Sequence, residues 1–172
     1  RLISVCGLVN EKQKLTYGDN KRSNLNEVVE QIEYALEQHP LSLVCIDSIQ
    51  LIGSVNHRDN RYAQVAEISG VLKKLSIKHN IPFLVTSAVN RNLEQRADKR
   101  PLLSDLRDSG TIEDDADVVM FTYRDELYCD DSLEAGTAEV ILGKQRTGPI
   151  GKVRLIFNGQ FSRFDTYVQP KQ

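Results

Sequence analysis

Residues 43–51, LVCIDSIQL, form an apolar run that ends on a single aspartate, Asp47, before the chain turns polar. A strand that is buried on both faces of a parallel sheet has such a near-continuous apolar sequence. An ionised carboxylate is costly to bury unless it is paired or lies near a metal, and open α/β sheets bind ligands at the carboxyl ends of their strands. The run therefore predicts a buried strand that ends at a ligand-binding edge. The alternative is an aspartate that only caps the following turn.

The segments around this run alternate between strands and helices. Residues 24–39 are predicted to be helical, because Asn24 and Glu27 have the spacing of a capping box. A second helix is predicted over about 61–79, with Val65, Ile68, Leu72 and Leu75 on its inner face. Core strands are predicted at 43–47, 82–87 and 118–123, and the strands of a β-rich last third at 137–143, 152–157 and 161–164. This order predicts an α/β fold with a mostly parallel sheet and a C-terminal antiparallel β extension.

Bulk properties narrow the class of protein. The 172 residues are expected to form one domain, 1–172, and the start on Arg1 rather than Met is typical of a fragment. A net charge of −2 gives no overall nucleic-acid signature, so any such site must be a local patch. The three cysteines form no C-x-x-C pair, which indicates reduced thiols in a cytosol-like compartment. No apolar stretch is long enough to span a membrane.

The segment 143–151, GKQRTGPIG, places two cations at the end of a predicted strand. Lys144 and Arg146 are two residues apart, so strand alternation points both to one side, and the following Gly-Pro predicts a turn. Two cations without a neighbouring acid suit a polyphosphate. The alternative is a solvated hairpin end. The phosphate-cradling pattern G-x-x-x-x-G-K-[ST] does not occur in these 172 residues.

Residues 88–107 are predicted to form a long solvated loop with few apolar positions. Its basic residues are Arg91, Arg96, Lys99, Arg100 and Arg107. Loops of this length are uncommon unless they are functional or disordered. Clustered arginines followed by Gly110 suit close approach to a phosphate backbone, and the scarcity of aromatic residues argues against base stacking. The alternatives are a mobile charged loop and arginines that pair with Asp98, Asp105 or Asp108.

Together these features resemble one family over about residues 41–167. The resemblance is carried by IDSIQLI (46–52), VAEISGVLKKLS (65–76), NRNLEQRADKRPLLSDLRDSGTIEDDADVVMFTYRDELY (90–128) and GKQRTGPIGKVRLIFNGQFSRFD (143–165). They are similar to the C-terminal, RecA-like ATPase domain of DnaB-type hexameric replicative helicases. Residues 1–22 match more loosely, and 1–15 look like the helix after the phosphate loop. In that family the phosphate loop and the catalytic glutamate lie upstream, so these residues alone are expected not to hydrolyse ATP.

The resemblance implies roles in nucleotide chemistry. Asp47 is similar to the acid that holds the magnesium ion of bound ATP, and Ser87 to a residue beside the nucleotide. Lys144 and Arg146 resemble the pair that reaches into the neighbouring subunit's ATP and stabilises the transferring phosphate.

The resemblance also implies roles in DNA binding. Arg91, Arg107, Asp108 and Gly110 match positions on the loops that line the central channel and hold single-stranded DNA. The chain departs from the family at Ala88, where a glutamine usually stands. The resemblance implies that this glutamine senses the terminal phosphate or the DNA.

The implied function is that of a ring helicase. A homo-hexamer would translocate on single-stranded DNA with ATP and Mg²⁺ and unwind duplex at a replication fork, with a primase and a helicase loader as partners. The expected location is a bacterial cytoplasm, a phage-infected cell or an organelle stroma, with no membrane. Two alternatives stay open: a divergent RecA-type recombination or repair ATPase, and a non-catalytic relic that binds DNA or assembles into the ring.

Overall fold

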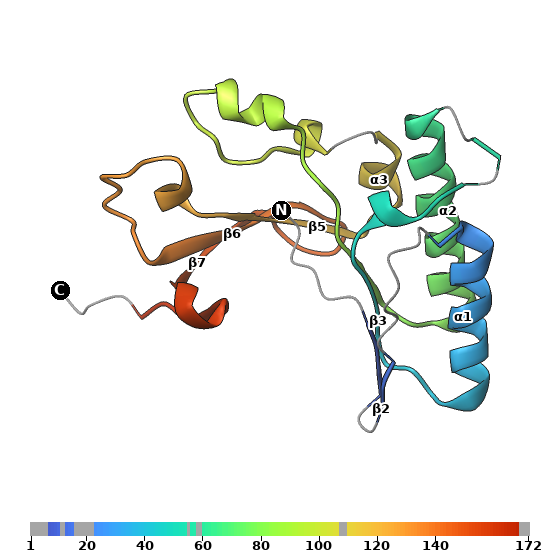
Figure 1. Ribbon diagram of the computed structural model, residues 1–172. Coiled ribbons are helices and arrows are strands. Elements are labelled where there is room, and N and C mark those ends of the chain that lie inside the picture. Colours follow the sequence, from blue (N-terminus) through green and yellow to red (C-terminus); the bar gives the residue numbers. More distant parts are fainter. Residues whose placement is uncertain are drawn as a thin grey trace. The chain divides into compact units, whose positions relative to one another are not determined.

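The computed structural model describes residues 7–10, 13–15, 23–54, 56–57, 60–106 and 110–168 (Figure 1). They form two compact units. The α/β unit consists of the described parts of 2–88 and 106–116, and the antiparallel unit of the described parts of 89–105 and 117–172. The expectation of a single domain stays a prediction.

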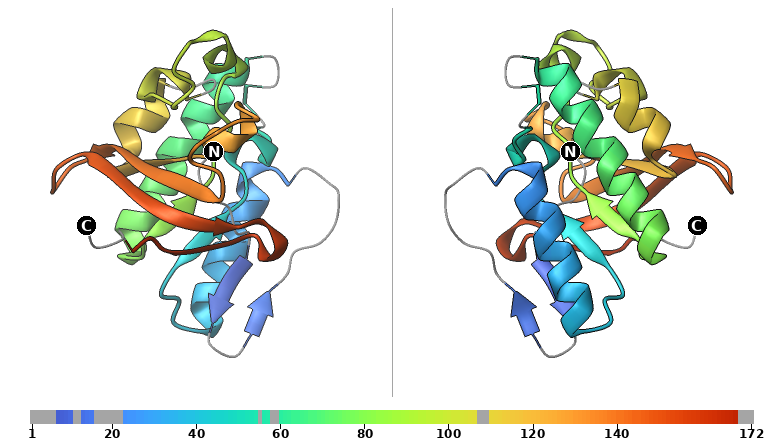
Figure 2. Two further views of the ribbon diagram at one scale, coloured as in Figure 1. Left: turned by 90° about the vertical axis from the view of Figure 1, so that its left-hand side faces the viewer. Right: turned by 90° about the vertical axis from the view of Figure 1, so that its right-hand side faces the viewer.

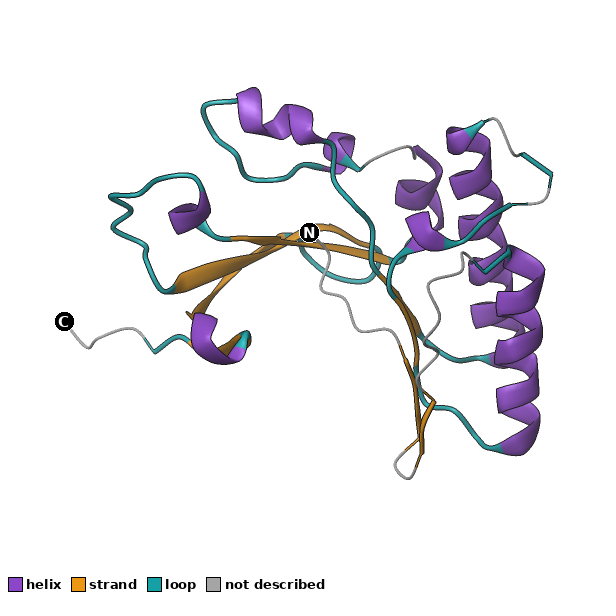
Figure 3. Cartoon of the chain, viewed as in Figure 1, coloured by secondary structure: helices purple, strands orange, loops and turns teal. Residues whose placement is uncertain are grey.

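The secondary structure follows the predicted alternation (Figure 3). The helices are α1 (Leu25–Gln38), α2 (Arg61–His79) and α3 (Gly110–Asp115). The strands are β1 (Gly7–Asn10), β2 (Gln13–Leu15), β3 (Val44–Ile46), β4 (Phe83–Val85), β5 (Val118–Tyr123), β6 (Thr137–Gln145), β7 (Gly151–Asn158) and β8 (Arg163–Thr166).

The α/β unit is built around a sheet in the order β2-β1-β3-β4. Its two inner strands are β1 and β3, and β1 pairs antiparallel with both β2 and β3. The pair of β3 with the edge strand β4 is parallel. Helices α1 and α2 lie on one face of this sheet (Figure 2). The core between them is aliphatic and includes Ile32, Val44, Val65, Ile68 and Leu72. This packing fixes the two strand ends that follow β3 and β4.

Local sequence explains where the two long helices begin and end. At the start of α1, the Asn24 side chain accepts a hydrogen bond from Glu27 N, and Glu27 reaches back to Asn24 N, so the predicted capping box is confirmed. At the start of α2 the Asn60 side chain accepts a hydrogen bond from Ala63 N, without a reciprocal bond, and Asn80 ends α2 in the left-handed conformation at φ 52°. None of the described helices is long and apolar enough to cross a membrane.

The antiparallel unit is a meander in the order β5-β6-β7-β8. In β5, Val119, Phe121 and Tyr123 are buried, whereas Val118 and Met120 are partly exposed. This alternation is typical of a strand with one face on a core and one face open.

The α/β fold with an antiparallel extension is confirmed, with two corrections. Residues 118–123 form the predicted strand, but β5 pairs with β6 in the antiparallel unit and is not paired with β3 or β4. The helix expected over 1–15 is wrong where the chain is described, because β1 and β2 are strands there. Gly7 and Asn10 are both poor helix formers.

Candidate functional site

Asp47 lies at the carboxyl end of β3, where the sequence predicted a ligand-binding edge. Its side chain is exposed, and Thr86, at the end of the neighbouring parallel strand β4, donates a hydrogen bond from Oγ1 to Asp47 Oδ1 at 2.7 Å. Ser87 follows directly and is buried. The structure therefore brings Asp47 and the Thr86-Ser87 pair to one edge of the α/β unit.

Gln50 ties the turn after Asp47 to the end of β4. Its Nε2 donates to Ser87 Oγ at 2.8 Å, and its Oε1 accepts from Ala88 N at 3.2 Å. Arg61, the first residue of α2, donates to the backbone oxygen of Gln50. Sequence reasoning assigned no role to Gln50 or Thr86. The only sequence signal was the presence of polar residues at the ends of two apolar strands.

The chemistry of this edge fits a magnesium ion bound together with a nucleotide. Among the described residues there is no cluster of three or more His, Cys, Asp or Glu side chains that could hold a metal by themselves. Mg²⁺ needs no such cluster, because it keeps several waters and is commonly bound through one or two carboxylates plus substrate phosphates. The exposed carboxylate of Asp47 meets that requirement.

The two predicted phosphate-binding cations belong to the antiparallel unit. Lys144 lies in β6 opposite Val119, and Arg146 follows the end of that strand, where residues 146–150 turn the chain into β7. Arg146 N donates to Asp117 O at 3.0 Å, and Arg146 Nε lies 3.3 Å from Asp117 Oδ1. Both side chains of this ion pair are at least half exposed. The predicted turn is confirmed, and Asp117 is a partner that the sequence pattern did not reveal.

Gly143, which directly precedes Lys144, is needed for close packing. A Cβ at this position would lie 2.8 Å from Cε2 of Phe121, a ring with 0% exposure, and 3.4 Å from Cδ2 of Leu103. Real Cβ atoms essentially never come within 3.0 Å of such a neighbour. The absent side chain therefore lets β6 lie directly on the Phe121 ring.

We expect Gly143→Ala to destabilise the protein, because added volume in a packed core costs about 1–3 kcal/mol. The measurement is the thermal or denaturant midpoint of the full-length protein. Gly151→Ala is the matched control in the same hairpin, because a Cβ at Gly151 meets nothing within 4 Å. Equal midpoints for the two variants would contradict the packing argument.

The segment 91–105 is exposed over much of its length, as the sequence predicted, but some of its side chains also pack and pair inside the antiparallel unit. The Arg96 guanidinium donates two hydrogen bonds to the Asp105 carboxylate, from Nη1 to Oδ1 at 3.0 Å and from Nη2 to Oδ2 at 2.7 Å. Asp105 Oδ2 also accepts a hydrogen bond from Leu102 N at 2.8 Å. Asp105 and Leu93 are both buried. Two short 3-10 turns, Arg91–Gln95 and Leu103–Asp105, complete the segment. Arg96 is therefore used inside the fold.

Arg100 is also bound internally. Its guanidinium donates to both carboxylate oxygens of Glu139 on β6, at 2.7 and 2.9 Å, and lies 4.7 Å from the centre of the Tyr123 ring. This hydrogen bonding holds the pKa of Glu139 below its usual value and raises that of Arg100. The same guanidinium lies 3.2 Å from Asp98. Two of the five basic residues in the predicted loop are thus engaged by acids of the same unit.

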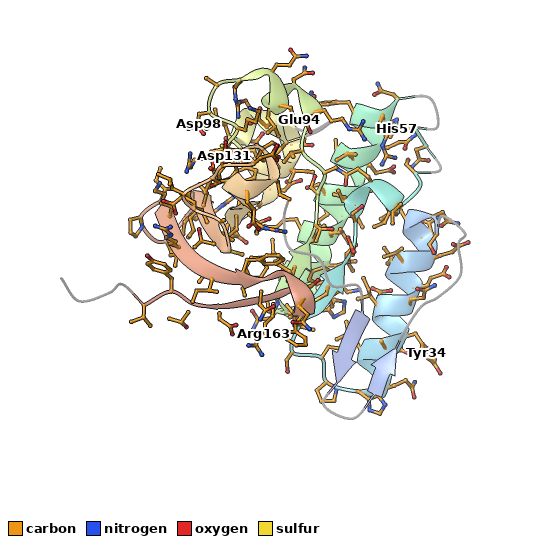
Figure 4. All side chains as sticks on the ribbon, turned by 60° about the vertical axis from the view of Figure 1, so that its left-hand side comes forward. Tyr34, His57, Glu94, Asp98, Asp131 and Arg163 are labelled. Atoms are coloured by element: carbon orange, nitrogen blue, oxygen red, sulfur yellow. The ribbon has the colours of Figure 1, made fainter. Side chains whose placement is uncertain are left out.

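Arg91 is the predicted DNA contact that the structure leaves available. Its side chain is exposed and makes no hydrogen bond or ion pair with the described residues. Gly110 is exposed at the start of α3, in the α/β unit. Arg107 and Asp108 lie outside the described residues. Figure 4 shows Glu94 and Asp98, from the segment that begins at Arg91, at the end of the antiparallel unit opposite Arg163.

The curated proteins to which this chain is similar include several replicative DNA helicases named DnaB. The replicative DNA helicase DnaB of Haemophilus influenzae is 45% identical over 173 aligned positions, which cover the whole of this chain and 37% of that protein. The chain thus spans about a third of the length of the curated relatives it matches.

Solved structures show the same relationship. The ATPase domain of G40P superimposes with a TM-score of 0.79 at 35% identity, covering 85% of this chain and 52% of that one. A DnaB-like replicative helicase, described with its interactions with primase, gives the same score and identity and is covered over 35% of its length. The fold is that of a RecA-like ATPase domain. The sequence model of the "DnaB-like helicase C terminal domain" matches residues 2–166, and the chain therefore belongs to that family.

Proposed function

We propose that the protein is an ATP-dependent replicative DNA helicase, which assembles as a homo-hexamer, translocates on single-stranded DNA and unwinds duplex at a replication fork. The observation that carries this proposal is the position of Asp47. It is an exposed carboxylate at the carboxyl end of β3, beside the end of β4, in a chain that belongs to the DnaB-like family. Open α/β sheets bind their ligands at this edge.

In the proposed reaction, Asp47 holds the Mg²⁺ of bound ATP, and Ser87 contacts the nucleotide from the neighbouring strand end. The metal ion would neutralise charge on the phosphates. Lys144 and Arg146 act on the ATP of the adjacent subunit and stabilise the charge of the transferring phosphoryl group. Their position at a hairpin end, next to an exposed turn, supports a role towards a neighbouring molecule.

The proposed DNA contacts are made to the phosphate backbone. Arg91 supplies an exposed cation, and Gly110 allows a close approach of the main chain. Arg107 and Asp108 are proposed from their sequence positions alone. Asp108 would act through its backbone, since its own charge repels phosphate. The acidic overall charge supports recognition by a few local cations over a general basic surface.

The proposed partners are a primase and a helicase loader, and the proposed location is the bacterial cytoplasm or an equivalent compartment. A solved relative is described with its interactions with primase, which supports the first partner. The other partners and the compartment follow from the family role.

The proposal is tested by unwinding of a forked DNA substrate with the full-length protein, ATP and Mg²⁺. Asp47→Asn should lower the unwinding rate by at least about tenfold, because the metal supplies several kcal/mol of charge stabilisation. Asp131→Asn, an exposed acid in the antiparallel unit (Figure 4), is the matched control and should behave like the parent. DNA binding without nucleotide hydrolysis by the parent would favour a non-catalytic relic.

A further inference from the structure

Thr86 is fixed by the same segment that its side chain contacts. Thr86 N donates to Ile46 O at 2.9 Å, and Thr86 O accepts from Ile49 N at 3.0 Å, so its main chain is bound on both sides of Asp47. The residue is 4% exposed. A β-branched side chain has few χ1 choices even before packing restricts it. The Thr86 hydroxyl is therefore held in place before any ligand arrives.

This fixed hydroxyl acts on only one oxygen of Asp47. Thr86 Oγ1 lies 2.7 Å from Asp47 Oδ1, which is a normal length for a hydrogen bond from a hydroxyl to a carboxylate. Asp47 Oδ2 makes no hydrogen bond with the part of the chain that the structure describes. Because Asp47 is exposed, its carboxylate would otherwise rotate among several orientations.

We infer that Thr86 is a positioning residue for the metal-binding carboxylate: its hydroxyl holds Asp47 Oδ1 so that Oδ2 faces the hydrated magnesium ion of the nucleotide. The inference rests on the proposed function of Asp47. Groups that orient a metal ligand typically change metal affinity 10- to 100-fold when they are removed. An exposed carboxylate with one such partner belongs near the lower end of that range.

The test uses Thr86→Val and Thr86→Ser in the full-length protein. Valine keeps the shape and removes the hydroxyl, whereas serine keeps the hydroxyl. The probe is a fluorescent ADP analogue titrated with Mg²⁺, and separately with Mn²⁺. Thr86→Val should raise the metal concentration for half-maximal binding about tenfold, with an unchanged thermal midpoint in the absence of nucleotide. Thr86→Ser should restore the parental value.

Thr137→Val is the matched control, because the Thr137 hydroxyl also donates a hydrogen bond at 2.7 Å, to Glu134 O, in the antiparallel unit. It should leave the metal dependence unchanged. A parental metal dependence for Thr86→Val, or an equal loss in Thr86→Ser, overturns the inference.

The same titration with Asp47→Asn separates the two possible failures. If Asp47→Asn weakens metal-dependent binding and Thr86→Val does not, only the role of Thr86 is wrong. If Asp47→Asn also binds like the parent, the proposed metal site itself is wrong.

Discussion

Replacing Arg146 by alanine in the full-length protein should lower the rate of ATP hydrolysis about a thousandfold, with little change in nucleotide affinity. A cation that acts across a subunit boundary stabilises the charge that develops in the transition state more than the charge of bound ATP. Its loss therefore lowers kcat and leaves ground-state binding nearly intact. The measurements are steady-state hydrolysis with DNA present and equilibrium binding of a fluorescent nucleotide.

Mixed rings test whether Arg146 acts in trans. Arg146→Ala and Asp47→Ala subunits should partly restore hydrolysis when they are combined, because one type of mixed interface contains both an intact Asp47 and an intact Arg146. Arg163→Ala, which removes a guanidinium from β8 that is 63% exposed against 51% for Arg146, is the control and should hydrolyse ATP like the parent. Mixed rings that stay inactive at every ratio would show that the two residues do not act at a shared interface.

The ion pair of Arg146 with Asp117 does not conflict with this prediction. The two side chains are 51% and 60% exposed, and ion pairs that are this open to solvent contribute roughly 0–1 kcal/mol. Such a pair orients Arg146 without holding it against a phosphate, which offers stronger charge and more acceptor oxygens.

The second large effect is expected from Arg91→Ala on DNA binding. Each lost phosphate contact should make the log–log dependence of affinity on salt shallower by about 0.7 on single strands. If every subunit of a hexamer loses one contact, the slope should become shallower by about 4 in total, which corresponds to a loss of about four orders of magnitude in affinity at 0.1 M salt relative to 1 M. The loss should be equal for all base sequences. Titration of labelled oligonucleotides at several salt concentrations measures both quantities.

Two variants make the DNA experiment specific. Arg163→Ala removes the same charge from β8 of the antiparallel unit and should leave the salt dependence unchanged. Arg96→Ala should lower the thermal midpoint, because it leaves the buried Asp105 carboxylate without its guanidinium partner. A parental salt slope for Arg91→Ala, or a loss confined to one base sequence, would exclude backbone tracking by this segment.

Local signals in the sequence were sufficient for much of the α/β unit. Asn24 and Glu27 predicted the start of α1, and the spacing of Val65, Ile68, Leu72 and Leu75 predicted the buried side of α2. The apolar run into Asp47 predicted β3 and the strand end that carries the candidate site. In each case the information lies within a single helix or a single short strand.

Contacts between distant segments could not be predicted in this way. Arg100 and Glu139 are 39 positions apart, and so are Asp47 and Thr86. No local pattern links such residues, because their pairing depends on which strands become neighbours. The density of basic residues therefore predicted a solvated loop. In the folded protein, Arg96 and Arg100 are bound by carboxylates of the same unit. The correct local prediction of residues 118–123 as a strand likewise carried no information about β6 as its partner.

The two hydrogen bonds of the Gln50 side chain affect which side chains residue 88 can carry without loss of the local backbone structure. The Gln50 side-chain amide accepts a hydrogen bond from Ala88 N and donates one to Ser87 Oγ. Neither bond involves the side chain of residue 88. A glutamine at position 88, which the resemblance to the family leads us to expect, could therefore be replaced by alanine without loss of these two hydrogen bonds. Position 50 is the more constrained of the two, because replacing Gln50 would remove the hydrogen bonds to both Ser87 and Ala88.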